Sequence, residues 1–260
     1  MRYYLYVSDA KLDMLFEQID RGVLKRISAE VKVDLKLASV TLTRAENPAP
    51  ARAAKLRVVE RYIERHHFVG DIEKPGSEYF RGRMAMTWGW LRWRADVDQN
   101  GLPRRDMVLF QGQQGKHTLG LAGGGRHVLA WQGIGEESGW GLTSLALDIF
   151  WALDQHISNA PELTDQLRGR PIREGGGFAA ALNARLFHGP SQFVEFLAVP
   201  LAQDKYESDG PSVSVDGIPL RLPAQNTILG TPIYVALASE PEIGTTALGD
   251  PVRADEAHSE

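Results

Sequence analysis

Three short apolar runs separated by clusters of glycine constrain the fold of this 260-residue chain more than any other feature. The runs lie at residues 107–111, 116–121 and 127–132, and glycines fill both intervals between them. Glycine readily adopts the positive φ angles that tight hairpin turns need. The spacing therefore predicts a β-meander, in which consecutive strands pair antiparallel.

A strict alternation predicts another strand at residues 31–37. Val31, Val33, Leu35 and Leu37 alternate with charged residues, which is the period-two pattern of a strand with one buried face. Further strands are predicted at residues 2–7, 83–93, 193–201, 213–215, 218–222 and 228–238.

Apolar residues spaced three and four apart predict helices after Ser8, at residues 51–66 and at 138–158, with shorter ones at 161–167 and 178–187. Ser8 is a residue type that caps a helix N-terminus. The predicted fold class is α+β: mainly antiparallel strands, in a meander and hairpins, packed with about four to five helices.

We predict a single domain over residues 1–238, with strand-rich segments at 1–132 and 193–238 and a helical segment at 138–188. The second strand block is too small to fold alone. Residues 239–260 hold six acidic residues and one arginine among Pro, Gly and Ala, so we expect a disordered acidic tail.

The chain contains no cysteine, which excludes a disulfide framework, a thiolate zinc site and a cysteine nucleophile. It has no run of 18 apolar residues, and its start lacks the apolar core of a secretory signal. We therefore expect a soluble cytoplasmic protein with no membrane partner.

The net charge of −4 is unevenly distributed, because residues 1–105 carry 20 Lys and Arg against 14 Asp and Glu. A basic front half could meet nucleic acid or another anionic partner. The excess is small and no aromatic–basic RNA motif accompanies it, so the sequence does not favour a nucleic-acid partner.

Residues 112–133 hold seven glycines together with two pairs of basic residues. Backbone N–H groups in a glycine turn form a concavity that binds anions, and adjacent cations strengthen it. The candidate ligand-binding residues are Lys116, His117, Gly123, Gly124, Gly125, Arg126 and His127. The alternative is that the glycines serve only as hairpin turns.

No cofactor or metal site is predicted, since the glycine-rich segment matches neither a Walker loop nor a dinucleotide fingerprint, and H-E-x-x-H is absent. No G-x-S-x-G elbow is present either. The first hypothesis is a non-enzymatic sensor or interaction protein that binds a small anionic ligand or a protein partner near residues 112–127. The alternative is a hydrolase or transferase that uses His117 and His127, because histidine transfers protons near neutral pH.

Three segments carry a resemblance: the start YYLYVSDAKLDMLFEQI, the middle FQGQQGKHTLGLAGGGRHVLA and the end ILGTPIYVALA. Together they resemble an uncharacterised bacterial family found mainly in actinobacteria. The resemblance spans residues 1–238 and implies one unit of constant length in a bacterial cytoplasm. That family has no established activity, so the resemblance assigns no catalytic residue here.

Overall fold

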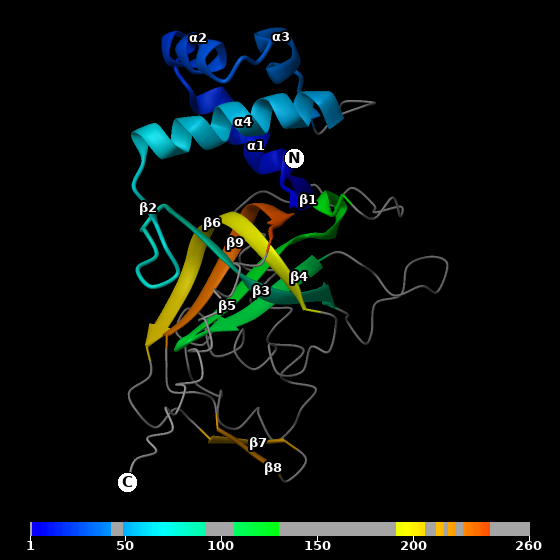
Figure 1. Cartoon of the computed structure of the whole chain (residues 1–260), viewed down its shortest axis with the longest axis vertical. Helices are drawn as coiled ribbons and strands as arrows, with labels where there is room; N and C mark the ends of the chain where they lie inside the picture. Colours follow the sequence, from blue (N-terminus) through cyan, green and yellow to red (C-terminus); the bar gives the residue numbers. More distant parts are fainter. Residues whose placement is uncertain are drawn as a thin grey trace, which may run out of the picture.

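The computed structural model describes residues 2–42, 49–91, 107–129, 191–205, 212–215, 218–221 and 226–239. Figure 1 shows a layer of helices at one end of a strand barrel and a small hairpin at the opposite end. The predicted α+β class is confirmed, since the described residues form both helices and a sheet. The sheet, however, is a closed barrel.

The barrel has five strands: β3 (Tyr79–Leu91), β4 (Met107–Gln114), β5 (His117–Gly124), β6 (Gln192–Lys205) and β9 (Asn226–Leu237). Strand β3 pairs with β4 through its second half and with β6 through its first half. Strands β4 and β5 pair antiparallel, β5 and β9 pair parallel, and β9 pairs antiparallel with β6. These five pairings close the ring.

The order β3-β4-β5-β9-β6 is the strand order of an OB-type barrel, a five-stranded Greek-key arrangement. The predicted meander is therefore wrong, because the second neighbour of β5 is β9 from far along the chain. Closure of the ring removes the two exposed edges that a meander would leave.

The predicted third meander strand does not start at His127. Residues Gly125–His127 form the 3-10 helix η2, and the next residue, Val128, bridges to Tyr6 of β1 (Tyr3–Val7). Strand β1 pairs antiparallel with the end of β9, so the N-terminal strand completes the wall where β5 has ended.

Alternate residues of the five strands point inward and fill the barrel with large apolar side chains. Phe80 and Phe196 meet edge to face there, with ring centroids 5.6 Å apart. The other inward residues include Met84, Met86, Val108, Phe110, Leu119, Leu121, Val194, Ala198, Ile228 and Val235. The barrel is a packed core and not a channel.

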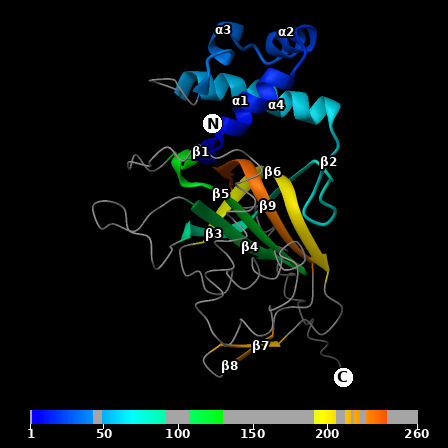
Figure 2. The same ribbon diagram turned by 180° about the vertical axis from the view of Figure 1, so that it is seen from behind.

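Four helices form the layer: α1 (Asp9–Gln18), α2 (Arg21–Glu30), α3 (Leu35–Ala38) and α4 (Ala49–His66). Their apolar faces join outward residues of β6 and β9, among them Leu197, in one buried cluster. Figure 2 shows the layer from behind, again over the same end of the barrel. The predicted helices after Ser8 and at 51–66 are confirmed.

The predicted strand at residues 31–37 is wrong. Val31 ends helix α2, and Asp34 caps α3 by accepting a hydrogen bond from the Lys36 N–H at 2.8 Å. Val31 and Val33 pack against the helical cluster from a turn. Val31, Val33 and Leu35 are half-buried and Leu37 is exposed, so a turn followed by a short helix takes the place of the buried strand face that the alternation predicted.

The remaining described strands are β2 (Val69–Gly70), parallel to the start of β3, and the antiparallel hairpin of β7 (Ser212–Val215) and β8 (Ile218–Arg221). The predicted helices within 138–188 and the tail 240–260 lie outside the described residues. In the described part of the chain, no helix is both long enough and apolar enough to cross a membrane.

Candidate functional site

The structure divides the predicted ligand-binding residues between the two ends of β5. Lys116 lies in the β4–β5 turn and His117 begins β5, whereas Gly123 and Gly124 end it and η2 continues with Gly125, Arg126 and His127. An eight-residue strand rises about 3.3 Å per residue, so its ends lie roughly 23 Å apart. The seven residues cannot form one site.

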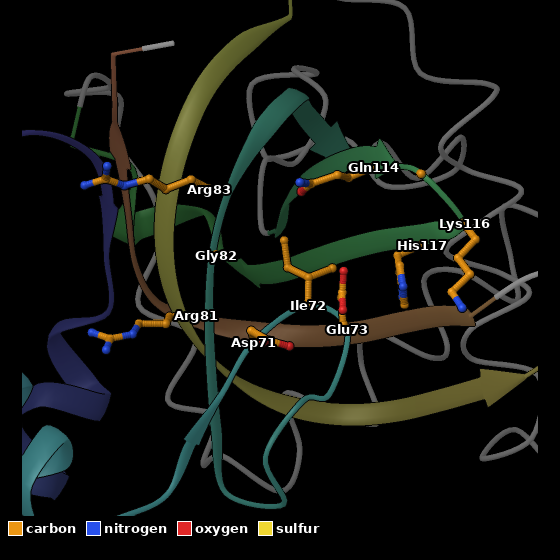
Figure 3. Close-up of a pocket in the computed structure, with 10 residues that line it drawn as sticks. Asp71, Ile72, Glu73, Arg81, Gly82, Arg83, Gln114, Lys116 and His117 are labelled. Atoms are coloured by element: carbon orange, nitrogen blue, oxygen red, sulfur yellow. The ribbon is translucent and has the colours of Figure 1, made fainter. Parts of the chain in front are cut away.

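A pocket of about 440 Å³ opens at the Lys116 end of β5. Its walls are the loop after β2, the first half of β3 and the β4–β5 turn. Figure 3 shows Lys116 and His117 on one side of this space, with Asp71 and Glu73 facing them from the loop. This pocket contains the first half of the predicted site.

The loop after β2 is shaped by a local turn. The Asp71 carboxylate accepts a hydrogen bond from the Lys74 N–H at 2.7 Å, which presents Ile72 to the mouth of the barrel. Ile72 is buried there with the barrel core. It lies so close to Gly82 that a Cβ atom at residue 82 would come within 2.5 Å of the Ile72 Cδ1 atom.

Two arginines contribute their stems to the pocket but not their charges. The Arg81 guanidinium lies 3.1 Å from Glu64, and that of Arg83 lies 2.8 Å from Glu195. In Figure 3 both side chains point away from Lys116. Lys116 itself forms no ion pair with any described residue.

His117 is buried at the inner edge of the pocket. The Asn226 amide nitrogen lies 3.4 Å from its Nδ1 atom. Donation from that amide leaves the hydrogen of the neutral imidazole on Nε2. The pocket therefore offers an ammonium group and a ring N–H beside two carboxylates that accept hydrogen bonds.

The Arg126 end of β5 is different in kind, because His127 is buried beneath helix α1. The Asp9 N–H lies 3.3 Å from its Nδ1, and the Arg126 Nε lies 3.3 Å from its Nε2. A neutral imidazole accepts at one nitrogen only, so it accepts from one of these donors. Burial, with the nearby charges of Arg126, Lys11 and Arg52, lowers the pKa of His127 to about 3.

A pKa of about 3 makes His127 a weak base at neutral pH. It also lies at the far end of β5 from His117. The two imidazoles therefore cannot share one catalytic site. An enzyme that uses either histidine alone stays a prediction.

Lys11 was not singled out from the sequence, although it belongs to the same end of the barrel. Its side chain is 2% exposed, and its Nζ atom donates to the Thr231 hydroxyl at 2.8 Å and to the Pro232 carbonyl at 3.0 Å. Burial lowers the pKa of the amine to about 7. The sequence feature that could have indicated burial of Lys11 is its position one helical turn before Leu15, on the apolar face of α1.

Ser8, Asp9, Lys11, His127 and Thr231 form what we call the buried polar cluster. It unites the three segments that carry the family resemblance, because residues 8–11, 123–127 and 230–232 meet here. Its hydrogen bonds join α1 to the barrel, and the neighbouring Arg126 is exposed. Ligand binding by the motif residues at this end stays a prediction.

No group of three or more His, Asp or Glu side chains in the described ranges is arranged to hold a metal ion. The site of interest is the pocket at Lys116. Together the fold and this pocket define a helix-capped, OB-type barrel with a polar pocket beside its β4–β5 turn.

The chain belongs to a family of unknown function, DUF7019, which matches residues 2–239. This confirms membership of an uncharacterised family. No curated protein and no solved structure matches the chain.

Proposed function

We propose that this chain is a non-enzymatic binding protein that takes a small anionic ligand in the pocket at Lys116 and His117. The observation that supports it most directly is the ammonium group of Lys116, which no described residue pairs, at the rim of a 440 Å³ space. An unpaired cation beside a ring N–H is suited to a phosphate or carboxylate group.

The carboxylates of Asp71 and Glu73 narrow the ligand class. Both lie on the loop side of the pocket, facing Lys116 and His117 (Figure 3). Carboxylates accept hydrogen bonds from hydroxyl or amino groups and repel a second anionic group. A small molecule with one anionic end and several hydroxyls, such as a sugar phosphate, matches this arrangement.

The barrel topology alone would favour another class of ligand. OB-type barrels bind oligonucleotides and oligosaccharides on the outer face of their second and third strands. Those strands are β4 and β5 here, and their outward side chains Leu109, Gln111 and Ala122 are buried. The fold likeness therefore gives no support to a nucleic-acid function, since function depends on the site and not on the fold.

Calorimetric titration of the purified chain with inorganic phosphate, glucose 6-phosphate and AMP tests the proposal. We expect glucose 6-phosphate to bind more tightly than phosphate, because it also reaches Asp71 and Glu73. The variant Lys116→Ala should weaken binding about tenfold or more, as expected for loss of a hydrogen bond from a charged group.

The matched control is Lys25→Ala, which removes an exposed lysine of α2 at the opposite end of the molecule (Figure 1). Its affinity should equal that of the wild type. Absence of heat with all three probes, or equal binding by Lys116→Ala and the wild type, would contradict an anion site in this pocket.

A further inference from the structure

The exposed surface of helices α2 and α3 carries an unusual set of free cations. Within the described residues, Arg21, Lys25, Arg26, Lys32 and Lys36 are exposed and form no ion pair. The neighbouring arginines of α4 behave differently, because Arg61 and Arg65 both pair with Glu30.

The same surface exposes apolar side chains. Leu37 is 45% exposed and Val40 is 38% exposed, and they are two of the four large hydrophobic residues that the described part of the chain leaves exposed. We call the five cations with Leu37 and Val40 the basic helical surface. Residues 21–36 carry these five cations against Glu30 and Asp34.

The C-terminal segment 240–260 is complementary in charge to the basic helical surface. It carries six acidic residues against a single arginine, and it intersperses them with Ile243, Leu248 and Val252. It also lies beyond the part of the chain that matches the family, which ends at residue 239. An acidic segment with scattered aliphatic residues matches a basic surface with two exposed aliphatic residues.

The geometry of the last strand brings this segment close to the surface. Strand β9 ends at Leu237, which pairs with Tyr3 of β1 beneath the helical layer (Figure 1). Arg2, the residue before β1, donates a hydrogen bond of 2.8 Å to Glu60 of α4, and α4 contacts both α2 and α3.

The length of the segment is sufficient. Twenty-one residues span up to about 70 Å when extended, whereas the 18-residue helix α4 is about 27 Å long. Attachment to the same chain raises the local concentration of the segment to the millimolar range. A weak contact between opposite charges is then populated without a second molecule.

We propose that residues 240–260 dock onto the basic helical surface of their own chain, through contacts of their carboxylates with the cations of α2 and α3. The contact shields exposed Leu37 and Val40 and neutralises the basic surface. It is independent of the pocket at Lys116, whose lining contains no residue of α2 or α3.

The absence of cysteine makes a direct test available. The full chain carrying Ala257→Cys takes a nitroxide label at this one position, and amide spectra then report which residues the label approaches. We expect the amides of α2 and α3 to lose at least half of their intensity. At about 1 M salt, where the screening length is about 3 Å, the intensity should return.

Two charge-reversal variants distinguish docking on the basic helical surface from attraction of the acidic segment to any cation of the chain. Lys32→Glu with Lys36→Glu should abolish the loss of intensity. Lys74→Glu with Lys205→Glu makes the same change in net charge at exposed residues of the β2–β3 loop and of β6 and should leave the loss of intensity intact. Unperturbed spectra of both variants without the label establish that they are folded.

Three outcomes would overturn the proposal. The first is no loss of intensity in α2 and α3, and the second is a loss that persists after Lys32 and Lys36 are reversed. The third is a loss seen equally when the label sits on a different molecule from the one observed. In that last case the occupant of the surface is the tail of a second copy.

Discussion

Two lysines of this chain are buried beneath the helical layer, and they are accommodated in different ways. The Lys55 ammonium lies against the Asp13 carboxylate at 2.5 Å. Lys11 forms no ion pair with a carboxylate of the described residues, and it donates to the Thr231 hydroxyl and the Pro232 carbonyl. Burial without a compensating charge disfavours the protonated amine, which is why the pKa of Lys11 falls to about 7.

The lowered pKa of Lys11 leads us to predict that the stability of the folded chain depends on pH. The pKa of Lys11 is about 7 in the folded chain against 10.5 for an ordinary lysine, so between these values the unfolded chain binds more protons. Stability must therefore rise with pH across this window. Relative to Lys11→Met, the wild type should gain about 1 kcal/mol in free energy of unfolding per pH unit from about pH 7.5 to about pH 9.5.

Chemical denaturation of both proteins at several pH values measures this difference. All other titrating groups are shared, so the difference isolates Lys11. A gap between wild type and variant that stays constant with pH would show that the amine is charged in the folded chain.

At the scale of elements, the loop between β2 and β3 closes the mouth of the barrel with a single side chain. Ile72 from this loop fills the space above Gly82 and reaches Phe196 of the barrel core. A Cβ atom on residue 82 would lie 2.5 Å from Ile72 and 2.9 Å from Phe196. The glycine is needed here for a close approach, not for an unusual φ angle.

We predict that Gly82→Ala lowers the free energy of unfolding by about 1–3 kcal/mol through overpacking. Ile72→Ala alone also destabilises the chain, because it leaves a cavity. The double variant should be more stable than the sum of the two effects by at least about 1 kcal/mol, since it removes the clash. Denaturant titrations of the four proteins give this coupling energy, and simple additivity would mean that Ile72 does not occupy this place in solution.

At the scale of the whole molecule, the helical layer and the barrel share a core. One apolar cluster contains Ile63 of α4 together with Leu197 of β6 and Ile233 of β9. A polar link lies beside it, because Glu60 of α4 accepts hydrogen bonds from Arg2 at 2.8 Å and from the Tyr234 hydroxyl at 3.0 Å. These contacts join the helical layer to the barrel, and the single domain over residues 1–238 stays a prediction.

We therefore expect the layer and the barrel to unfold in one cooperative transition. Hydrogen exchange measures this directly, since the slowest amides of α4, such as Val59, and of β9, such as Val235, should open with the same free energy. Opening of α4 at a free energy lower by about 2 kcal/mol or more would instead indicate that the helices form a separate unit.

Local chemistry made several elements predictable from the sequence. Strand β1, the Ser8 cap of α1, helix α4 and the hairpin of β7 and β8 each depend on residues that are neighbours in the chain. The glycine-rich segment likewise predicted a hairpin between residues 111 and 116, where Gly115 has the positive φ of 56° that glycine adopts without strain. Half of the candidate site followed from this turn, because it places Lys116 and His117 at the pocket.

The remaining features depended on contacts between distant segments. Closure of the barrel required β9 to pair with β5 across roughly a hundred residues of chain. The alternation at residues 31–37 predicted a strand with one buried face, but packing against the helical cluster places Val31 and Val33 in a turn, and Leu37 is exposed in a short helix. Residues close together in the chain thus specified the local elements and the glycine turns. The separation of the candidate residues came from the fold, because an eight-residue strand holds its two ends roughly 23 Å apart whatever side chains they carry.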